Sequence, residues 1–160
     1  MKYKLYSYPF LSILILSSLI FPASYVFGQC KEKVSEANRK IVHYHDIRLS
    51  DKGEYLTFTR CDKERLFSYN NEELEMVYHV RMFTEIRVFS SRGNFSLYTT
   101  KSERAPWQPL MTLWTPITPT ELQKMKGITR IEVIFSEEKR VFVFSAASIK
   151  LLQKALACMN

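Results

Sequence analysis

The chain has 160 residues, of which 46% are hydrophobic and 14% aromatic, and its formal net charge is +7. This composition excludes a disordered chain, because the apolar content is sufficient for a packed core. The positive charge is modest, and lysine and arginine alternate with aspartate and glutamate over much of the chain, which is typical of an ordinary solvated surface.

The first 28 residues have the three-part layout of a secretory signal peptide. Two early lysines form the basic start, an apolar run extends from Phe10 to Phe21, and a looser stretch ends at Gly28. Small residues precede the bond between Gly28 and Gln29, where we expect cleavage. The sequence therefore predicts an exported protein, periplasmic or extracellular, whose residues 29–160 form one domain.

Two alternatives keep this segment at a membrane. Residues 9–27 approach the roughly 20 apolar residues that a spanning helix needs, so an uncleaved anchor is the first alternative. The second is a bacterial lipoprotein acylated on Cys30, although Gln29 stands where a lipid-attachment site has a small residue. Either alternative would make the protein a membrane-tethered component of the cell envelope.

The first half of the mature chain changes from helical to strand periodicity. Apolar residues in 31–40 have helix-like spacing and predict a short helix. Residues 41–49 and 54–60 then predict a hairpin that turns at Gly53. In its second strand Leu56 and Phe58 share one face and are expected in the core.

The middle of the chain contains a second predicted hairpin. Residues 70–79 fit a helix and a strand equally well. Residues 80–89 alternate, so that Ile86 and Val88 share one face with Val80 and Met82, and 95–100 form the return strand. Residues 110–114 are a short apolar run that we expect at a sheet edge.

Two helices are predicted in the last third. Thr118, Pro119 and Glu121 form a capping box with proline at the first helical position, which predicts a helix over 119–126 that ends at Gly127. Residues 130–135 alternate as a strand, and 141–144 are apolar on both faces, which favours a place inside the sheet. An amphipathic helix capped by Ser145 or Ser148 ends the chain.

These elements predict an α+β domain. It consists of a largely antiparallel sheet of about 6 to 7 strands, with the C-terminal helix and one or two short helices packed on it. The strands are expected to be antiparallel because the predicted turns are too short for parallel crossovers.

Three cysteines, Cys30, Cys61 and Cys158, enter an oxidising compartment on export and allow one intramolecular disulfide. Cys30 is expected on a loose end. We therefore predict a disulfide between Cys61 and Cys158, which would stabilise the fold by on the order of 4 kcal/mol. Pairing of Cys30 with Cys158 is the alternative.

The strongest candidate for chemistry is the pair His43 and His45. Residues two apart on a strand point the same way, so both imidazoles can approach one Zn²⁺, with His79 or a carboxylate as a third ligand. Two ligands match many surfaces by chance, and we favour two half-exposed histidines without a metal. No serine-hydrolase elbow, phosphate loop, zincin helix or Cys-x-x-Cys pair is present in the sequence.

Other candidates concern binding. Arg81, Arg87 and Arg92 follow one predicted strand and turn, and form the first surface to consider for an acidic partner. Trp107 in a proline-bearing loop, with Trp114 after it, is the one aromatic feature suited to a contact surface, but we favour packing of these rings under the loop. Asn94 begins an N-glycosylation sequon, which is relevant only in a eukaryotic host.

The sequence thus favours a small exported binding or interaction domain without catalysis. Its partner is expected to be an acidic protein, a glycan or an anionic membrane surface, with no specific nucleic-acid recognition and no cofactor. The alternative class is a metal-assisted hydrolase that uses the His43 and His45 pair.

Overall fold

A computed structural model describes residues 30–72, 83–104 and 110–160, except for the side chains of 101–104. In these ranges the strands form two antiparallel sheets. The six-stranded sheet has the order β1 (Lys31–Val34), β2 (Ile41–Arg48), β3 (Glu54–Cys61), β4 (Glu64–Asn71), β8 (Met111–Pro116) and β7 (Lys101–Arg104). The four-stranded sheet has the order β10 (Lys139–Val143), β9 (Ile128–Ile134), β5 (Glu85–Ser90) and β6 (Phe95–Tyr98).

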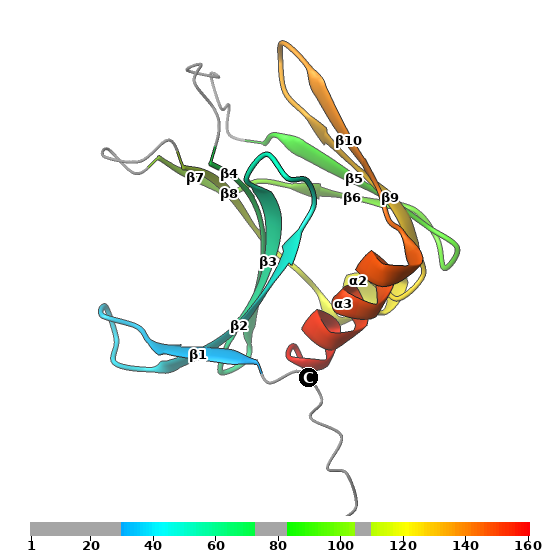
Figure 1. The fold of residues 1–160 in the computed structure, drawn as a ribbon. Helices are drawn as coiled ribbons and strands as arrows, with labels where there is room; N and C mark the ends of the chain where they lie inside the picture. The colour runs from blue at the N-terminus through cyan, green and yellow to red at the C-terminus, as the bar shows by residue number, and fades with distance from the viewer. Residues whose placement is uncertain (1–29, 73–82, 105–109) are drawn as a thin grey trace, which may run out of the picture.

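The α+β class and the antiparallel pairing are confirmed, whereas the prediction of one sheet with 6 to 7 strands is wrong. The six-stranded sheet is strongly curved, and the four-stranded sheet and both helices, α2 (Pro119–Met125) and α3 (Ala146–Ala157), lie on its convex side (Figure 1). Among the described strands, β5, β6, β9 and β10 pair only with one another and so form a sheet of their own.

The core lies between the convex side of the six-stranded sheet and the elements that cover it. Leu56 and Phe58, which were predicted to face the core, are fully buried. Ile86 and Val88, which were predicted to share a face, are also fully buried, whereas Val80 and Met82 of the same predicted face lie outside the described residues. Leu152 of α3 is also fully buried in this core. One apolar interior therefore joins both sheets and the C-terminal helix.

Both helices begin as the sequence predicts. The Thr118 hydroxyl accepts a hydrogen bond from the Glu121 backbone N–H at 3.2 Å, and the Glu121 carboxylate accepts from the Thr118 N–H at 2.7 Å, which completes the capping box. Ser145 caps α3 by accepting from the Ser148 N–H at 3.2 Å. The apolar stripe of α3 is buried, and Gln153 on its other side is exposed.

Three local predictions are wrong, and each failed because a distant strand decides the outcome. Residues 31–34 form β1 instead of a helix, because their backbone pairs with β2 in the register Lys31 to Tyr44. Strand β8 lies between β4 and β7 and is not at an edge. Strand β10, expected inside the sheet, is an edge strand with Val143 77% exposed.

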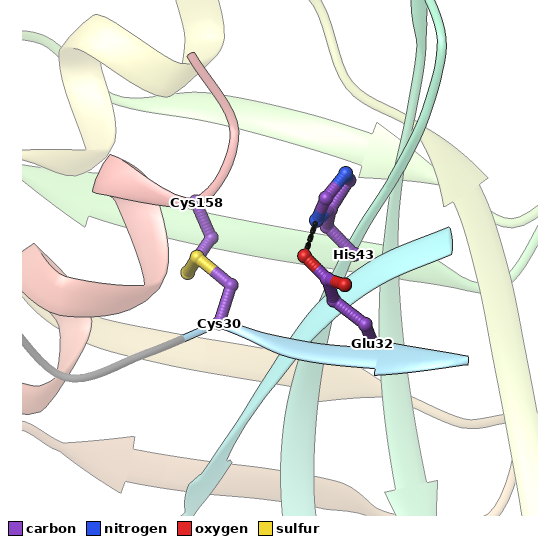
Figure 2. Close-up of a disulfide and its surroundings, with 4 residues drawn as sticks. All are labelled: Cys30, Glu32, His43 and Cys158. Carbon is purple, nitrogen blue, oxygen red and sulfur yellow. Dashed lines mark ion pairs between the residues drawn. A yellow bond between two sulfur atoms is a disulfide. The ribbon is translucent and has the colours of Figure 1, made fainter. Parts of the chain in front are cut away.

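The disulfide joins Cys30 to Cys158, so the predicted pairing of Cys61 with Cys158 is also wrong (Figure 2). Cys61 follows the alternation of Thr57 and Thr59 and lies on the concave face of the six-stranded sheet. Cys158 is the C-cap of α3, which lies on the opposite, convex side. Cys30 is not loose, because β1 begins at the next residue and carries it beside the end of α3.

Candidate functional site

The concave face of the six-stranded sheet holds a cavity of about 550 Å³, within the range typical of small-molecule sites. Its walls come from five neighbouring strands, β1, β2, β3, β4 and β8. Alternation places every second residue of each strand on this face, opposite to the core residues. We refer to this surface as the concave site, and its lining includes Lys33, Tyr44, Asp46, Arg48, Tyr55, Thr57, Thr59, Ser68, Asn70, Glu72, Thr112 and Trp114.

A row of hydrogen-bonded side chains forms the floor of the concave site. Thr112 Oγ1 donates to Asn70 Oδ1 at 2.9 Å, and Asn70 Nδ2 donates to Thr57 Oγ1 at 3.1 Å. Thr57 Oγ1 in turn donates to Asp46 Oδ1 at 2.8 Å. The strand register aligns this row, because Asp46 is paired with Thr57 and Asn70 with Thr112. The row crosses four strands, and its donors all point toward the Asp46 carboxylate.

The Asp46 carboxylate is held at the other side by a cation. Lys31 Nζ donates to Asp46 Oδ2 at 2.9 Å, and the Asp46 side chain remains 30% exposed. This hydrogen bond and the charge of Asp46 raise the pKa of Lys31. The Asp46 carboxylate is therefore held in a fixed position as an acceptor that still faces the cavity.

Three aromatic side chains, Tyr44, Tyr55 and Trp114, line the concave site from different strands. All three are half-buried. Trp114 Nε1 is buried and has no acceptor among the described residues. Partial burial, followed by the charges of Glu72 and Asp46, raises the pKa of Tyr55, so its hydroxyl stays protonated. The site thus combines flat apolar surfaces with hydrogen-bond donors.

The concave site has a cation at each end. Lys33 Nζ lies 5.4 Å from the ring centroid of Tyr44, a distance typical of a cation–π contact. At the other end Arg48 is paired across the strands with Tyr55. In the part of the chain that the structure describes, neither Lys33 nor Arg48 forms an ion pair. Both side chains belong to the lining of the site or of its ends and are exposed to solvent.

A second polar cluster, on the convex side of the same sheet, is closed to ligands. Tyr69 Oη donates to Glu54 Oε1 at 2.7 Å, and Ser50 Oγ donates to Glu54 Oε2 at 2.8 Å. Glu54 is 4% exposed and Tyr69 is fully buried. Burial, and then the hydrogen bond to Glu54, raise the pKa of Tyr69. This cluster satisfies polar groups in the core and joins the start of β3 to β4.

The structure places His43 and His45 on one face of β2, as expected for a strand, but this is the face toward α3. His43 Nδ1 lies 3.1 Å from Glu32 Oε1, close to the disulfide (Figure 2). Burial lowers the pKa of His45; Lys31 and Lys154 act in the same direction, and Asp46 opposes them. His79 lies outside the described residues. Among those that are described, no three histidine, cysteine or acidic side chains are arranged to hold a metal ion.

The predicted arginine surface is divided. Arg81 lies outside the described residues. Arg87 is exposed and donates to Glu85 Oε2 at 2.9 Å, which offsets its charge. Arg92 lies in the turn after β5 and lines a different cavity of about 350 Å³ with Lys126 and the end of α3. The structure therefore does not gather Arg87 and Arg92 into one site.

Sequence reasoning had named one residue of the concave site, Trp114, and only as the neighbour of the contact candidate Trp107. It missed the polar row and both cations. A signal was present in the first predicted hairpin. Its outward residues include Tyr55, Thr57 and Thr59, which carry hydroxyl groups but no charge, although a face open to water is usually charged. The sequence could not show that the same face of β4 and β8 continues this pattern.

Three further predictions concern the ends and turns of the chain. The cleavage site between Gly28 and Gln29 lies outside the described residues, as does Trp107. Asn94 is exposed, and its Oδ1 accepts from the Ser90 N–H at 3.0 Å. Over the ranges that the structure describes, none of the helices is long and apolar enough to span a membrane.

No family model, curated protein or solved structure matches the chain.

Proposed function

We propose that this chain is an exported binding protein without catalytic activity, and that its ligand lies in the concave site. The observation that carries the proposal is the hydrogen-bonded row from Thr112 to Asp46 on the floor of a 550 Å³ cavity. Binding sites combine apolar surface with a few fixed polar groups. Because the row is anchored on paired strands, its groups are oriented before a ligand arrives, which reduces the entropy lost on binding.

The disulfide supports export. Disulfides persist in oxidising compartments and are uncommon in the cytosol, and Cys30 is bonded to Cys158. The same bond counts against the lipoprotein alternative, because the Cys30 sulfur cannot carry an acyl chain while it is bonded to another sulfur. N-terminal sequencing of the secreted protein tests both points: a start at Gln29 agrees with export and cleavage, and an intact Met1 would contradict them.

Binding in the concave site can be tested with ligand-observed NMR and a panel of polar probes. The panel contains a neutral oligosaccharide, an acidic oligosaccharide, an acidic tripeptide and a nucleoside monophosphate. Two variants serve as a matched pair: Tyr55→Ala in the concave site, and Tyr98→Ala on the outer face of the four-stranded sheet, where Tyr98 is 52% exposed. We expect at least one probe to bind, and Tyr55→Ala but not Tyr98→Ala to abolish its signal. Binding of no probe, or binding insensitive to Tyr55→Ala, would contradict the proposal.

The zinc hydrolase stays a prediction and has its own test. Metal analysis of protein purified without a histidine tag would show about one Zn²⁺ per chain if His43 and His45 hold a catalytic metal. A zinc content near zero would end that alternative. The NMR experiment is independent of this result, because the histidines face α3 and the concave site lies on the opposite side of the sheet.

A further inference from the structure

We infer that the ligand of the concave site is an acidic oligosaccharide that lies along the strands between Lys33 and Arg48. This inference rests on the proposed function and names the chemical class of its ligand. Three features of the site carry it: the character of the polar floor, the position of the aromatic rings, and the charge at the two ends.

The floor suits hydroxyl groups. A hydroxyl both donates and accepts, and it is matched by side chains of mixed character. Thr57 and Thr59 line the cavity with hydroxyls, and Asp46 adds a fixed acceptor that is 30% exposed. A peptide that binds as an added strand pairs through its backbone with a sheet edge, whereas the floor of the concave site presents side chains from the middle of the sheet.

The aromatic rings suit the faces of sugar rings. The C–H groups on one face of a pyranose are apolar and weakly positive, and they pack on the negative face of an aromatic ring. Tyr44, Tyr55 and Trp114 supply such rings on three strands. Tyr44 and Arg48 are four residues apart on β2, which is about 13 Å at about 3.3 Å per residue. Because Arg48 is paired with Tyr55, the two tyrosines are separated by a similar distance along the strands. This is the length of a short oligosaccharide, not of a single sugar.

The charges determine which oligosaccharide fits. Lys33 lies beside the ring of Tyr44 at one end, and Arg48 is opposite Tyr55 in the strand register at the other end, where Glu72 also lines the site. A sugar whose ring stacks on either tyrosine and carries a carboxylate would place that carboxylate next to a cation without an ion-pair partner among the described residues. Such charge-assisted hydrogen bonds are stronger than neutral ones. The membrane surface is excluded as the occupant, because a bilayer is flat and the floor of the site is concave.

Isothermal titration calorimetry with three probes of equal length tests the inference. The probes are a trimer of galacturonic acid, the neutral trisaccharide maltotriose, and triglutamate. We expect the acidic trisaccharide to bind at least about tenfold more tightly than maltotriose or triglutamate, since it alone satisfies both the rings and the cations. We also expect 0.5 M NaCl to weaken this binding, because the cations are near the surface and their charges are screened.

Two arginine variants locate the effect. Arg48→Gln removes a cation of the concave site, and Arg87→Gln removes an exposed cation of the other sheet. Arg48→Gln should weaken binding of the acidic trisaccharide by about tenfold or more, whereas Arg87→Gln should change it less than about twofold. Both residues are exposed, so both variants are expected to fold, which equal thermal midpoints would verify.

The other outcomes separate this inference from the proposed function. Equal binding of triglutamate would overturn the assignment to a sugar, and equal binding of maltotriose would overturn the need for acidity. If neither trisaccharide binds but another polar probe does, and its binding depends on Tyr55, the assigned ligand class is wrong. The concave site would then still be a binding site. If no probe binds at all, both the inference and the proposed function fail.

Discussion

Removing the disulfide between Cys30 and Cys158 should destabilise the protein severely. The two residues are separated by 128 positions. For a loop of this length, the loss of conformational freedom in the unfolded chain stabilises the folded state by about 5 kcal/mol at 25 °C. Single domains have total stabilities of about 5–15 kcal/mol. The variant Cys30→Ala is therefore expected to lose a third or more of the free energy of unfolding. If the wild type has a stability near the lower end of this range, the variant will be largely unfolded.

Urea unfolding followed by circular dichroism measures this effect. Oxidised wild type is compared with Cys30→Ala and with the matched control Cys61→Ala. Cys61 is free and half-buried, so its replacement should change the free energy of unfolding by less than about 1 kcal/mol. Reduced wild type should unfold at the same urea concentration as Cys30→Ala, because both lack the same constraint.

The assignment also predicts the thiol content. One of the three cysteines, Cys61, should react with a thiol reagent in denaturant before reduction, and all three afterwards. The reasoning would be refuted if Cys61→Ala were as damaging as Cys30→Ala, or if peptide mapping joined Cys61 to Cys158. Unchanged stability of Cys30→Ala would refute the loop argument itself.

Three further predictions concern the two helices and the half-buried His45. Leu152→Ala, at a fully buried position of α3, should cost about 2–5 kcal/mol in urea unfolding, and the neighbouring Leu151→Ala, at a position 43% exposed, less than about 1 kcal/mol. Thr118→Ala removes the capping hydroxyl of α2 and should cost about 0.5–2 kcal/mol, whereas the exposed Thr120→Ala should be nearly neutral in the same assay. Burial lowers the pKa of His45 from its ordinary 6.5, so below that pH the unfolded chain binds a proton that the folded chain does not. The urea midpoint should therefore fall as pH decreases from above 6.5 toward the lower folded pKa, and His45→Asn should reduce this fall; an identical pH dependence in both proteins would contradict the assignment.

Much of the local structure followed from the sequence alone. The capping box at Thr118 and Glu121 fixed where α2 begins, since a side chain and a backbone group within four residues satisfy each other. The alternation of Leu56 and Phe58 correctly predicted which face of β3 is buried. These features depend on neighbours along the chain, so a single sequence contains the information for them.

The candidate site was only partly accessible to the same reasoning. Trp114 was singled out for its aromatic character and does line the concave site. The arginines 87 and 92 were selected for their proximity in sequence, but one is paired with Glu85 and the other lies at a separate cavity. The cations that flank the concave site, Lys33 and Arg48, are far from those residues in sequence and had no local signal.

What only the tertiary structure decided involves pairing between distant segments. Residues 31–34 become a strand because β2 supplies hydrogen-bond partners, and β10 becomes an edge because, among the described strands, it pairs only with β9. The disulfide follows the same principle, since the face on which Cys61 lies is defined by the curved sheet and not by its distance from Cys158 in the chain. The sequence by itself determined the strand periodicity and the helix starts, because both depend on residues close together in the chain. Strand partners, sheet edges and the concave site depend on contacts between residues far apart in the chain. For such contacts, many alternative pairings satisfy the same local pattern.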